Sequence, residues 1–275
     1  MVQRSRLLDA ILVDLYGPQR AITSGVLPPQ LLFAHPGYVR AARGSKYPAA
    51  TNCSCTAAMS AGTGPAVFSS TPTGRRHRRA PATRWPTVVS SCTLPRPLRA
   101  IRPRPTAPFA QALRLALIEA APETAEDPVV VVLSPGIHSE TAFDQAYLAS
   151  VLGFPLVESA DLVVRDGTLW MRSLGTLKRV DVVLRRVDAD YADPLDLRSD
   201  SQLGVVGLVE VQRRGAVTVV NTLGSGVLES PGLLRFLPEL AEQLLGETRS
   251  CTPHRCIGAV STPSAHTCWP TCRRC

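Results

Sequence analysis

The chain has 275 residues, 8 cysteines and a formal net charge of +8 at pH 7, from 30 basic and 22 acidic residues. No segment approaches the roughly 18 apolar residues that a membrane-spanning helix requires, and Asp9 and Asp14 interrupt the first apolar stretch before a signal-peptide core could form. These features exclude membrane-spanning and secreted proteins, so we expect a cytoplasmic protein without membrane partners.

Acidic residues and cysteines divide the chain into unlike parts. Twenty of the 22 acidic residues lie between Glu119 and Glu247, whereas all eight cysteines lie outside that range. Only the segment 109–249 alternates apolar runs and turns as a packed domain requires, and it contains no cysteine. A disulfide framework is therefore not indicated for the folded part of the chain.

The first predicted elements are a helix and a strand. A short amphipathic helix is expected to contain Asp9, Leu12 and Leu15. Residues 129–133 are four valines and a leucine, a run typical of a strand that is buried on both faces of a parallel sheet. Apolar residues then recur at helical spacing, which predicts a helix from about Ser139, whose hydroxyl can cap it.

Strands and a tight turn follow this helix. Strands are expected at 155–158 and 161–164, and the chain returns at 169–171 through an Asp166-Gly167 hairpin turn. Another strand is expected at 180–187, and an acidic loop closes it.

The last part of the domain repeats the alternation. A helix is expected at 203–213, a strand at 216–221, and a helix at 230–245 that Ser230 caps and Pro231 begins. The alternation of strands and helices predicts an α/β fold with a Rossmann-like, mostly parallel sheet.

Two stretches that follow predicted strands are candidate ligand sites. Ser134, Gly136 and His138 lie at the carboxyl end of the first strand, where open α/β sheets place ligands. The stretch Gly224-Ser225-Gly226 lies between a strand and a helix, where backbone N–H groups can hold an anion. A tight turn between strand and helix explains the two glycines equally well. A single histidine such as His138 is more often a surface residue than a catalytic one.

Charged residues at the end of the 180–187 strand form a third candidate. Arg185 and Arg186 are neighbours on a strand, so their side chains point to opposite faces. With Asp188 they can form a clamp for a carboxylate or a phosphate, and the alternative is a solvated strand end with surface ion pairs. Asn221 either orients a ligand or closes the turn after its strand.

Several motifs occur in the order of one known family. They are Ser134-Pro135-Gly136, the stretch 162–167, Arg185-Arg186-Val187-Asp188, Asp193-Pro194-Leu195, the stretch 221–231, and the N-terminal stretch 14–20 with Leu27-Pro28-Pro29 and His35-Pro36-Gly37-Tyr38. Together they resemble the circularly permuted ATP-grasp proteins of type 2, a bacterial family. Tyr16 and Arg20 become candidate ligand-binding residues through this resemblance alone.

The resemblance implies an ATP-dependent carboxylate-amine or carboxylate-thiol ligase in peptide synthesis or modification. In the related glutathionylspermidine synthetases, a carboxylate is activated as an acyl phosphate and attacked by an amine or a thiol. ATP and Mg²⁺ are the implied cofactors, a small molecule or peptide the implied substrate, and proteins of a peptide-modification system the implied partners. The competing hypothesis is a non-catalytic binding or scaffold protein that recognises a peptide or partner through a sheet edge.

The resemblance also assigns the parts of the chain. Residues 1–44 correspond to a remnant of the permuted ATP-grasp region, and 109–249 to the Rossmann-like domain that precedes the ATP-grasp fold. Residues 45–108 contain no acidic residue and no sustained apolar periodicity, which predicts disorder. The family's Gly-rich loop, its Glu-Asn-Arg cluster and its later lysines are missing, so we expect an incomplete ATP-grasp domain and an inactive chain.

Translation out of frame explains why both 45–108 and the tail 250–275 lack these motifs, and the nucleotide sequence tests this hypothesis. The tail contains the histidines and cysteines of a superficial zinc site, but His254-x-Cys256 and His266-x-Cys268 are spaced too closely for tetrahedral ligation. We expect a disordered tail and no metal. The Arg-rich stretch 75–79 attracts nucleic acid only through phosphates, so no specific nucleic-acid partner is expected.

Overall fold

The computed structural model describes residues 2–45, 107–122 and 125–246. The predictions of disorder for 45–108 and 250–275, the zinc alternative and the Arg-rich stretch therefore fall almost wholly outside the described residues. In the described part of the chain, no helix combines the length and the apolar character needed to cross a membrane.

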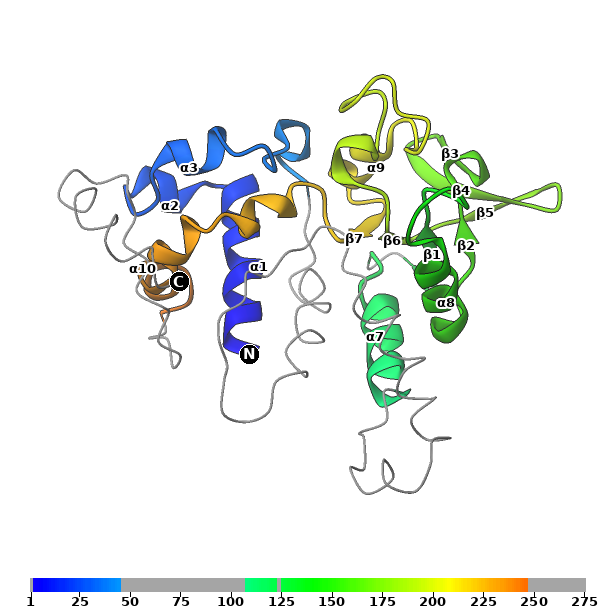
Figure 1. Cartoon of the computed structure of the whole chain (residues 1–275), viewed down its shortest axis with the longest axis horizontal. Helices are drawn as coiled ribbons and strands as arrows, with labels where there is room; N and C mark the ends of the chain where they lie inside the picture. The colour runs from blue at the N-terminus through cyan, green and yellow to red at the C-terminus, as the bar shows by residue number, and fades with distance from the viewer. Residues whose placement is uncertain (1, 46–106, 123–124, 247–275) are drawn as a thin grey trace.

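A parallel sheet of four strands forms the centre of the α/β part (Figure 1). The strands are β1 (Val130–Leu133), β2 (Leu156–Val157), β6 (Val182–Arg185) and β7 (Thr218–Val220), in the order β2-β1-β6-β7. Every residue of β1, β6 and β7 is buried, as the β-branched runs of these segments predict. The prediction of an α/β fold with a mostly parallel sheet is confirmed.

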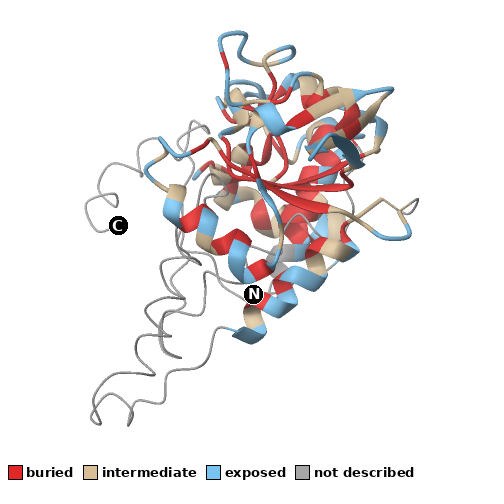
Figure 2. Cartoon of the chain, turned by 90° about the vertical axis from the view of Figure 1, so that its right-hand side faces the viewer, coloured by how far each residue is buried: buried red, intermediate tan, exposed pale blue. Residues whose placement is uncertain are grey.

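Helices cover both faces of this sheet. They are α7 (Ala107–Glu119), α8 (Ala142–Leu152) and α9 (Leu208–Arg214). Successive strand residues point to opposite faces, so Val130 and Val132 pack in one apolar cluster with α7 and α8, and Val131 and Leu133 in another that includes α9. Figure 2 shows the buried strands between the helices.

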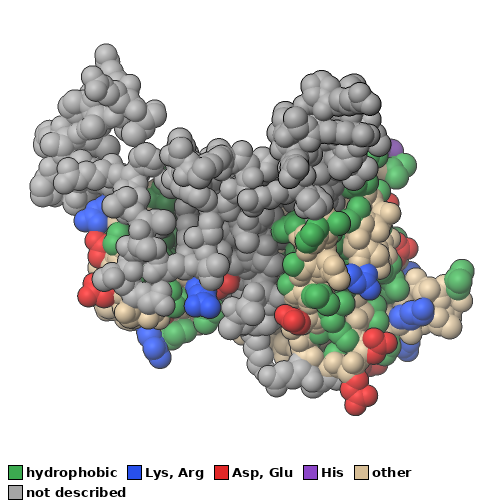
Figure 3. Space-filling model, turned by 90° about the horizontal axis from the view of Figure 1, so that it is seen from below, with side chains coloured by type: hydrophobic (Ala, Val, Ile, Leu, Met, Phe, Trp, Pro, Cys, Tyr) green, Lys and Arg blue, Asp and Glu red, His purple; other side chains and the backbone are tan. Residues whose placement is uncertain are grey.

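A second sheet extends from the first. It contains β3 (Leu162–Arg165), β4 (Thr168–Ser173) and β5 (Thr176–Arg179), all antiparallel. The predicted Asp166-Gly167 turn is confirmed, with φ values of 52° and 71° that suit a type I′ hairpin. The β4–β5 hairpin projects from the body of the protein as an arm that carries basic side chains (Figure 3), and Leu174 in its turn is fully exposed.

The N-terminal segment forms a helical layer beside the sheet. Its elements are α1 (Val2–Tyr16), α2 (Arg20–Thr23), α3 (Pro29–Phe33) and the 3-10 helix η1 (Arg40–Ala42). The long helix α1, predicted around Leu12 and Leu15, packs on α10 (Leu233–Leu245) from the other end of the described chain (Figure 1). Leu12 and Leu15 belong to the same apolar cluster as Val131, so one core joins the helical layer to the sheet.

Several predicted element boundaries were wrong. Helix α8 begins at Ala142 after Thr141, and the Ser139 hydroxyl accepts a hydrogen bond from the Thr141 N–H at 3.3 Å in the preceding turn instead of capping the helix. Gly207, with φ 82°, delays α9 from 203 to Leu208, since the left-handed conformation interrupts a helix.

The last helix also begins later than predicted. Ser230 does not cap α10, which starts at Leu233, because residues 225–229 form the separate 3-10 helix η4 (Ser225–Glu229). Two more 3-10 helices, η2 (Ser159–Asp161) and η3 (Ala189–Tyr191), follow β2 and β6. Strand β5 and helix α7 were not predicted at all.

Candidate functional site

The strand order creates a switch point between β1 and β6. From β1 the chain passes through α8 to β2 on one side, and from β6 it passes through α9 to β7 on the other side. Leu133 is paired with Arg185, so the two strands end at the same level. Loops that leave neighbouring parallel strands in opposite directions form a crevice, which is where open α/β sheets bind ligands.

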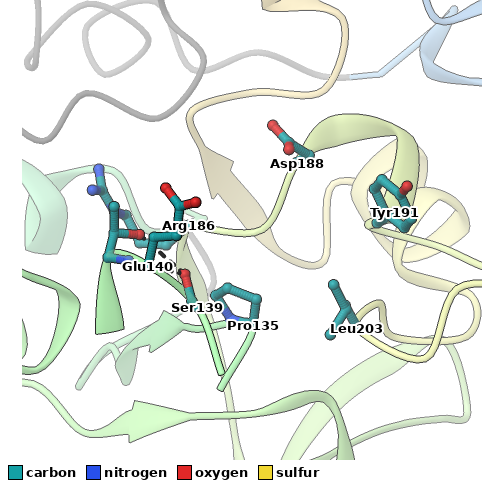
Figure 4. Close-up of a pocket in the computed structure, with 8 residues that line it drawn as sticks. Pro135, Ser139, Glu140, Arg186, Asp188, Tyr191 and Leu203 are labelled. Carbon is teal, nitrogen blue, oxygen red and sulfur yellow. Dashed lines mark hydrogen bonds between the residues drawn. The ribbon is translucent and has the colours of Figure 1, made fainter. Parts of the chain in front are cut away.

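A pocket of about 420 Å³ lies at this switch point (Figure 4). The loop after β1 and the loop after β6 both contribute to it, and the segment before α9 closes one side. Its lining residues are Pro135, Ser139, Glu140, Thr141, Arg186, Asp188, Tyr191 and Leu203. In the close-up, Arg186 and Glu140 lie on one side of the opening, and Tyr191 and Leu203 on the other.

The loop after β1 is shaped by Ser134 and Gly136. The Ser134 hydroxyl donates to Gln145 Oε1 at 2.5 Å and accepts from the Gly136 N–H at 3.0 Å. Gly136 has φ 96°, and a Cβ added there would meet the Glu158 carboxylate at 3.2 Å. These two candidates therefore set the path of the pocket loop without lining the pocket, and His138 is exposed and does not line it either.

Arg185 and Arg186 take different roles. The Arg185 guanidinium is buried and donates to the Asn221 carbonyl oxygen through Nε at 2.9 Å and Nη2 at 2.6 Å, and through Nη1 to the Val187 carbonyl. Asn221 returns a bond from Nδ2 to the Arg185 carbonyl at 3.0 Å. This pair ties the ends of β6 and β7 together, and Arg186 is the arginine that lines the pocket.

Asp193 builds the wall of the pocket that carries Tyr191 and Leu203. Its carboxylate is completely buried and accepts three backbone N–H groups, from Leu195 at 2.9 Å, Gly207 at 3.1 Å and Val209 at 2.9 Å. These bonds connect the two ends of the segment 193–209, so the irregular loop before α9 is held in one conformation.

Arg198 fixes the ring of Tyr191. Its guanidinium lies 4.7 Å from the ring centroid and donates from Nη1 to the Tyr191 hydroxyl at 2.6 Å. Asp200 accepts from the same guanidinium at 2.7 Å and 3.1 Å, and this hydrogen bonding lowers the pKa of the Asp200 carboxyl. The ring at the pocket opening is therefore held in place by its neighbours.

The stretch Gly224-Ser225-Gly226 lies elsewhere, against the N-terminal layer. The Tyr16 hydroxyl donates to the Gly224 carbonyl at 3.0 Å and accepts from the Val39 N–H at 3.2 Å. A Cβ added at Gly37 would lie 2.7 Å from the Gly226 carbonyl carbon. The structure thus brings two sequence motifs together, but at a packed junction and not at the pocket.

Arg20 belongs to the same junction through its backbone. The Asp14 carboxylate is buried and accepts the N–H groups of Arg20 at 2.8 Å and Ala21 at 2.9 Å, which holds the start of α2. The Arg20 side chain is exposed. The predicted candidates therefore fall into two groups, and of the twelve only Arg186 and Asp188 line the pocket.

Removal of the Tyr16 hydroxyl should destabilise the protein and change its response to alkaline pH. Tyr16→Phe leaves the Gly224 carbonyl and the Val39 N–H without this partner, so we expect a loss of about 1 to 2 kcal/mol in urea denaturation at pH 7. Burial raises the pKa of the Tyr16 phenol above its ordinary value of about 10. Because the folded state favours the neutral phenol, stability should be flat below about pH 10 and fall above it.

Two tyrosine variants distinguish the ionisation of Tyr16 from that of other groups as the cause of the alkaline loss of stability. Tyr16→Phe should reduce the alkaline slope, whereas Tyr38→Phe, which keeps the stacked ring 5.3 Å from Tyr16, should retain it. An unchanged slope in Tyr16→Phe would show that another group causes the loss.

The described residues form no Mg²⁺ site, and neither a lysine nor the glycine stretch lines the pocket to hold the phosphates of ATP. In the described ranges no group of three or more His, Cys, Asp or Glu side chains is arranged to hold a metal ion. The chain has two lysines, Lys46 and Lys178, and Lys178 lies on the exposed strand β5 outside the pocket lining. The glycine stretch 224–226 contacts Tyr16 and Gly37 instead of facing a cavity.

Sequence reasoning missed six of the eight described lining residues. They are Pro135, Ser139, Glu140, Thr141, Tyr191 and Leu203. The signal that could have found them is the strand order, because a switch point places the loops after β1 and β6 side by side.

Comparisons with known proteins match one family in both the N-terminal and the later part of the chain. A family model described as a circularly permuted ATPgrasp matches residues 87–253, and one described as circularly permuted ATP-grasp type 2 matches residues 1–65. An uncharacterized protein of Mycobacterium tuberculosis is 66% identical over 257 residues, which cover 90% of this chain and 28% of the relative. An uncharacterized protein of Synechocystis is 35% identical over 254 residues, covering 89% of this chain and 51% of the relative. The chain thus spans 28% to 51% of the length of these two relatives.

Proposed function

The chain belongs to the circularly permuted ATP-grasp family, and from this premise we propose that it forms the substrate-binding α/β part of an ATP-dependent carboxylate-amine or carboxylate-thiol ligase. Ligases of this kind act in peptide synthesis or modification. The observation that carries the proposal is the pocket at the switch point of the parallel sheet, with Arg186 in its lining.

Arg186 supplies the group that a carboxylate substrate requires. A guanidinium offers parallel N–H donors that match the two oxygens of a carboxylate. Arg186 is buried but for 7% of its surface, and it lies at the mouth of the crevice beside Ser139 and Thr141, which add hydroxyl groups. Pro135 and Leu203 add apolar surface to the same pocket.

ATP and Mg²⁺ serve the family as a whole, where they activate the carboxylate. Because the described residues form no Mg²⁺ site and place neither a lysine nor the glycine stretch in the pocket, we assign no activation step to these residues. The sequence lacks the family's Gly-rich loop, its Glu-Asn-Arg cluster and its later lysines, so we expect the 275-residue chain to show no saturable micromolar binding of ATP with Mg²⁺ in calorimetry. Saturable binding would place the nucleotide site within this chain and overturn this part of the proposal.

Carboxylate binding gives the direct test of the pocket. The full chain should bind 4-methylpentanoate more tightly than its primary amide, and Arg186→Gln should weaken acid binding about tenfold, because the charge-assisted bonds are lost. Arg165→Gln removes an exposed arginine on β3 and should leave binding unchanged. Equal binding of acid and amide, or equal effects of the two variants, would refute the proposed role.

A non-catalytic scaffold role is the second candidate, and one observation favours it. Strand β5 is an edge of the antiparallel sheet, three of its four residues are exposed, and the adjacent turn presents Leu174 to solvent. Edge strands of this kind can pair with an extended peptide or a partner protein. This role predicts no carboxylate binding that depends on Arg186, so the same titration separates the two candidates.

A further inference from the structure

We propose that the switch-point pocket selects a free α-amino acid with an apolar side chain. This inference rests on the proposed function, since it takes the carboxylate that Arg186 would bind as one end of the ligand. It adds a second requirement, an ammonium group, and a third, an apolar side chain.

The requirement for an ammonium group follows from the charges of the lining. Among the described lining residues, the carboxylates of Glu140 and Asp188 accompany the guanidinium of Arg186. A ligand with only a carboxylate would bring a third negative group beside these two, which is unfavourable, whereas a zwitterion presents opposite charge to both signs.

The arrangement of these groups fits a compact zwitterion. Arg186 comes from the end of β6, Asp188 lies two residues further along the same loop, and Glu140 comes from the loop after β1. The close-up places Asp188 between Arg186 and Tyr191 across the opening (Figure 4). In the close-up both acids lie on the side of the Arg186 guanidinium that faces the opening, so they can face an ammonium that lies one carbon from the carboxylate.

The preference for an apolar side chain follows from the apolar residues of the lining. Pro135 and Leu203 line the pocket, and Leu203 is still 37% exposed. An apolar side chain of a ligand would remove part of this surface from water. The volume of about 420 Å³ is at the lower end of small-molecule sites, roughly 300 to 1,000 Å³, which favours a single amino acid over a long peptide.

Three related ligands test the inference on the full, unmodified chain. They are L-leucine, 4-methylpentanoate, which lacks the amine, and L-leucinamide, which lacks the carboxylate. NMR-detected titration should give L-leucine an affinity at least about tenfold above that of each analogue. Ligands of this size bind weakly, so dissociation constants of about millimolar are expected.

Variants test which acids recognise the amine. Glu140→Gln combined with Asp188→Asn should abolish the preference for L-leucine over 4-methylpentanoate, whereas Glu242→Gln, at an exposed glutamate of α10, should retain it. Glu140 and Asp188 are exposed, and circular dichroism checks that the variants fold.

The outcomes distinguish a failure of the amino-acid inference from a failure of the carboxylate role of Arg186. If 4-methylpentanoate binds as tightly as L-leucine, or the double variant keeps the preference, the amino-acid inference is wrong while the carboxylate site stands. If L-leucinamide binds and 4-methylpentanoate does not, the carboxylate role of Arg186 fails, and with it both claims. If a basic amino acid such as L-arginine binds tenfold more tightly than L-leucine, the acids recognise a side chain and the inference is overturned. If none of the ligands binds, the proposed function fails as well.

Discussion

Gly224→Ala should lower the free energy of unfolding by about 3 kcal/mol or more. Gly224 has φ 80°, a conformation that an alanine adopts only with strain, and its added Cβ would overlap the hydroxyl oxygen and ring of Tyr16. Tyr16 is fully buried and cannot move aside, because its ring stacks on Tyr38 and its hydroxyl bridges to Val39. Urea denaturation followed by circular dichroism measures the loss.

Gly25→Ala is the matched control for this substitution. Gly25 has φ 78°, almost the same backbone conformation, but an added Cβ would have no atom within 4 Å. It should therefore show only the conformational cost of about 1 kcal/mol. The difference between the two variants isolates the overlap with Tyr16, and equal losses would show that the helical layer and the glycine loop are not packed as described.

Asp193→Ala should be the second severe variant, with a loss of about 3 to 5 kcal/mol. Three backbone N–H groups lose their acceptor, and one of them belongs to Val209, which is completely buried. The segment 193–209 then loses its fixed path, so the wall that carries Tyr191 and Leu203 is displaced from the pocket. Denaturation measures the stability, and the titration with L-leucine measures the pocket.

Two further variants test whether the hydrogen bonds of the Asp193 carboxylate cause this loss of stability. Asp196→Ala removes an exposed carboxylate three residues away and should change stability by less than about 0.5 kcal/mol. Asp193→Asn keeps one acceptor oxygen and should lie between the alanine variant and the wild type. If Asp193→Ala and Asp196→Ala behave alike, the three hydrogen bonds do not hold the loop.

The sheet and its connections could be predicted from the sequence, since they depend on local patterns. The valine run at 129–133 identified the central strand, and Asp166-Gly167 identified the hairpin, because each pattern favours one local conformation. Helix α7 was missed although Leu113 and Leu117 are buried, because it directly follows a Pro- and Arg-rich segment that hides its apolar spacing.

The candidate site was predicted only in part, because its groups meet through long-range packing. The sequence is compatible with an anion site at the glycine stretch 224–226, but Tyr16, which lies 208 residues before Gly224, occupies the space beside it. The sequence placed Arg185 and Arg186 on opposite faces of the strand but did not show which one lines the pocket, and only the neighbouring strand shows that Arg185 is held by Asn221. No local pattern reveals either contact.

The out-of-frame hypothesis stays a prediction. It concerns 45–108 and 250–275, of which the structure describes only residues 45, 107 and 108. The nucleotide sequence of codons 44–110 tests it, and a one-base shift should restore acidic residues, a Gly-rich loop and a Glu-Asn-Arg cluster.

The location of the ligand is tested most directly by NMR shift mapping of the isotope-labelled full chain during titration with L-leucine. The binding pocket predicts the largest backbone amide shifts at Ser139, Glu140, Thr141 and Asp188, with smaller changes at Tyr191. Residues 222–230, which include the glycine stretch, should shift little. The largest shifts in 222–230, with none in the loops after β1 and β6, would contradict a ligand site at the switch point.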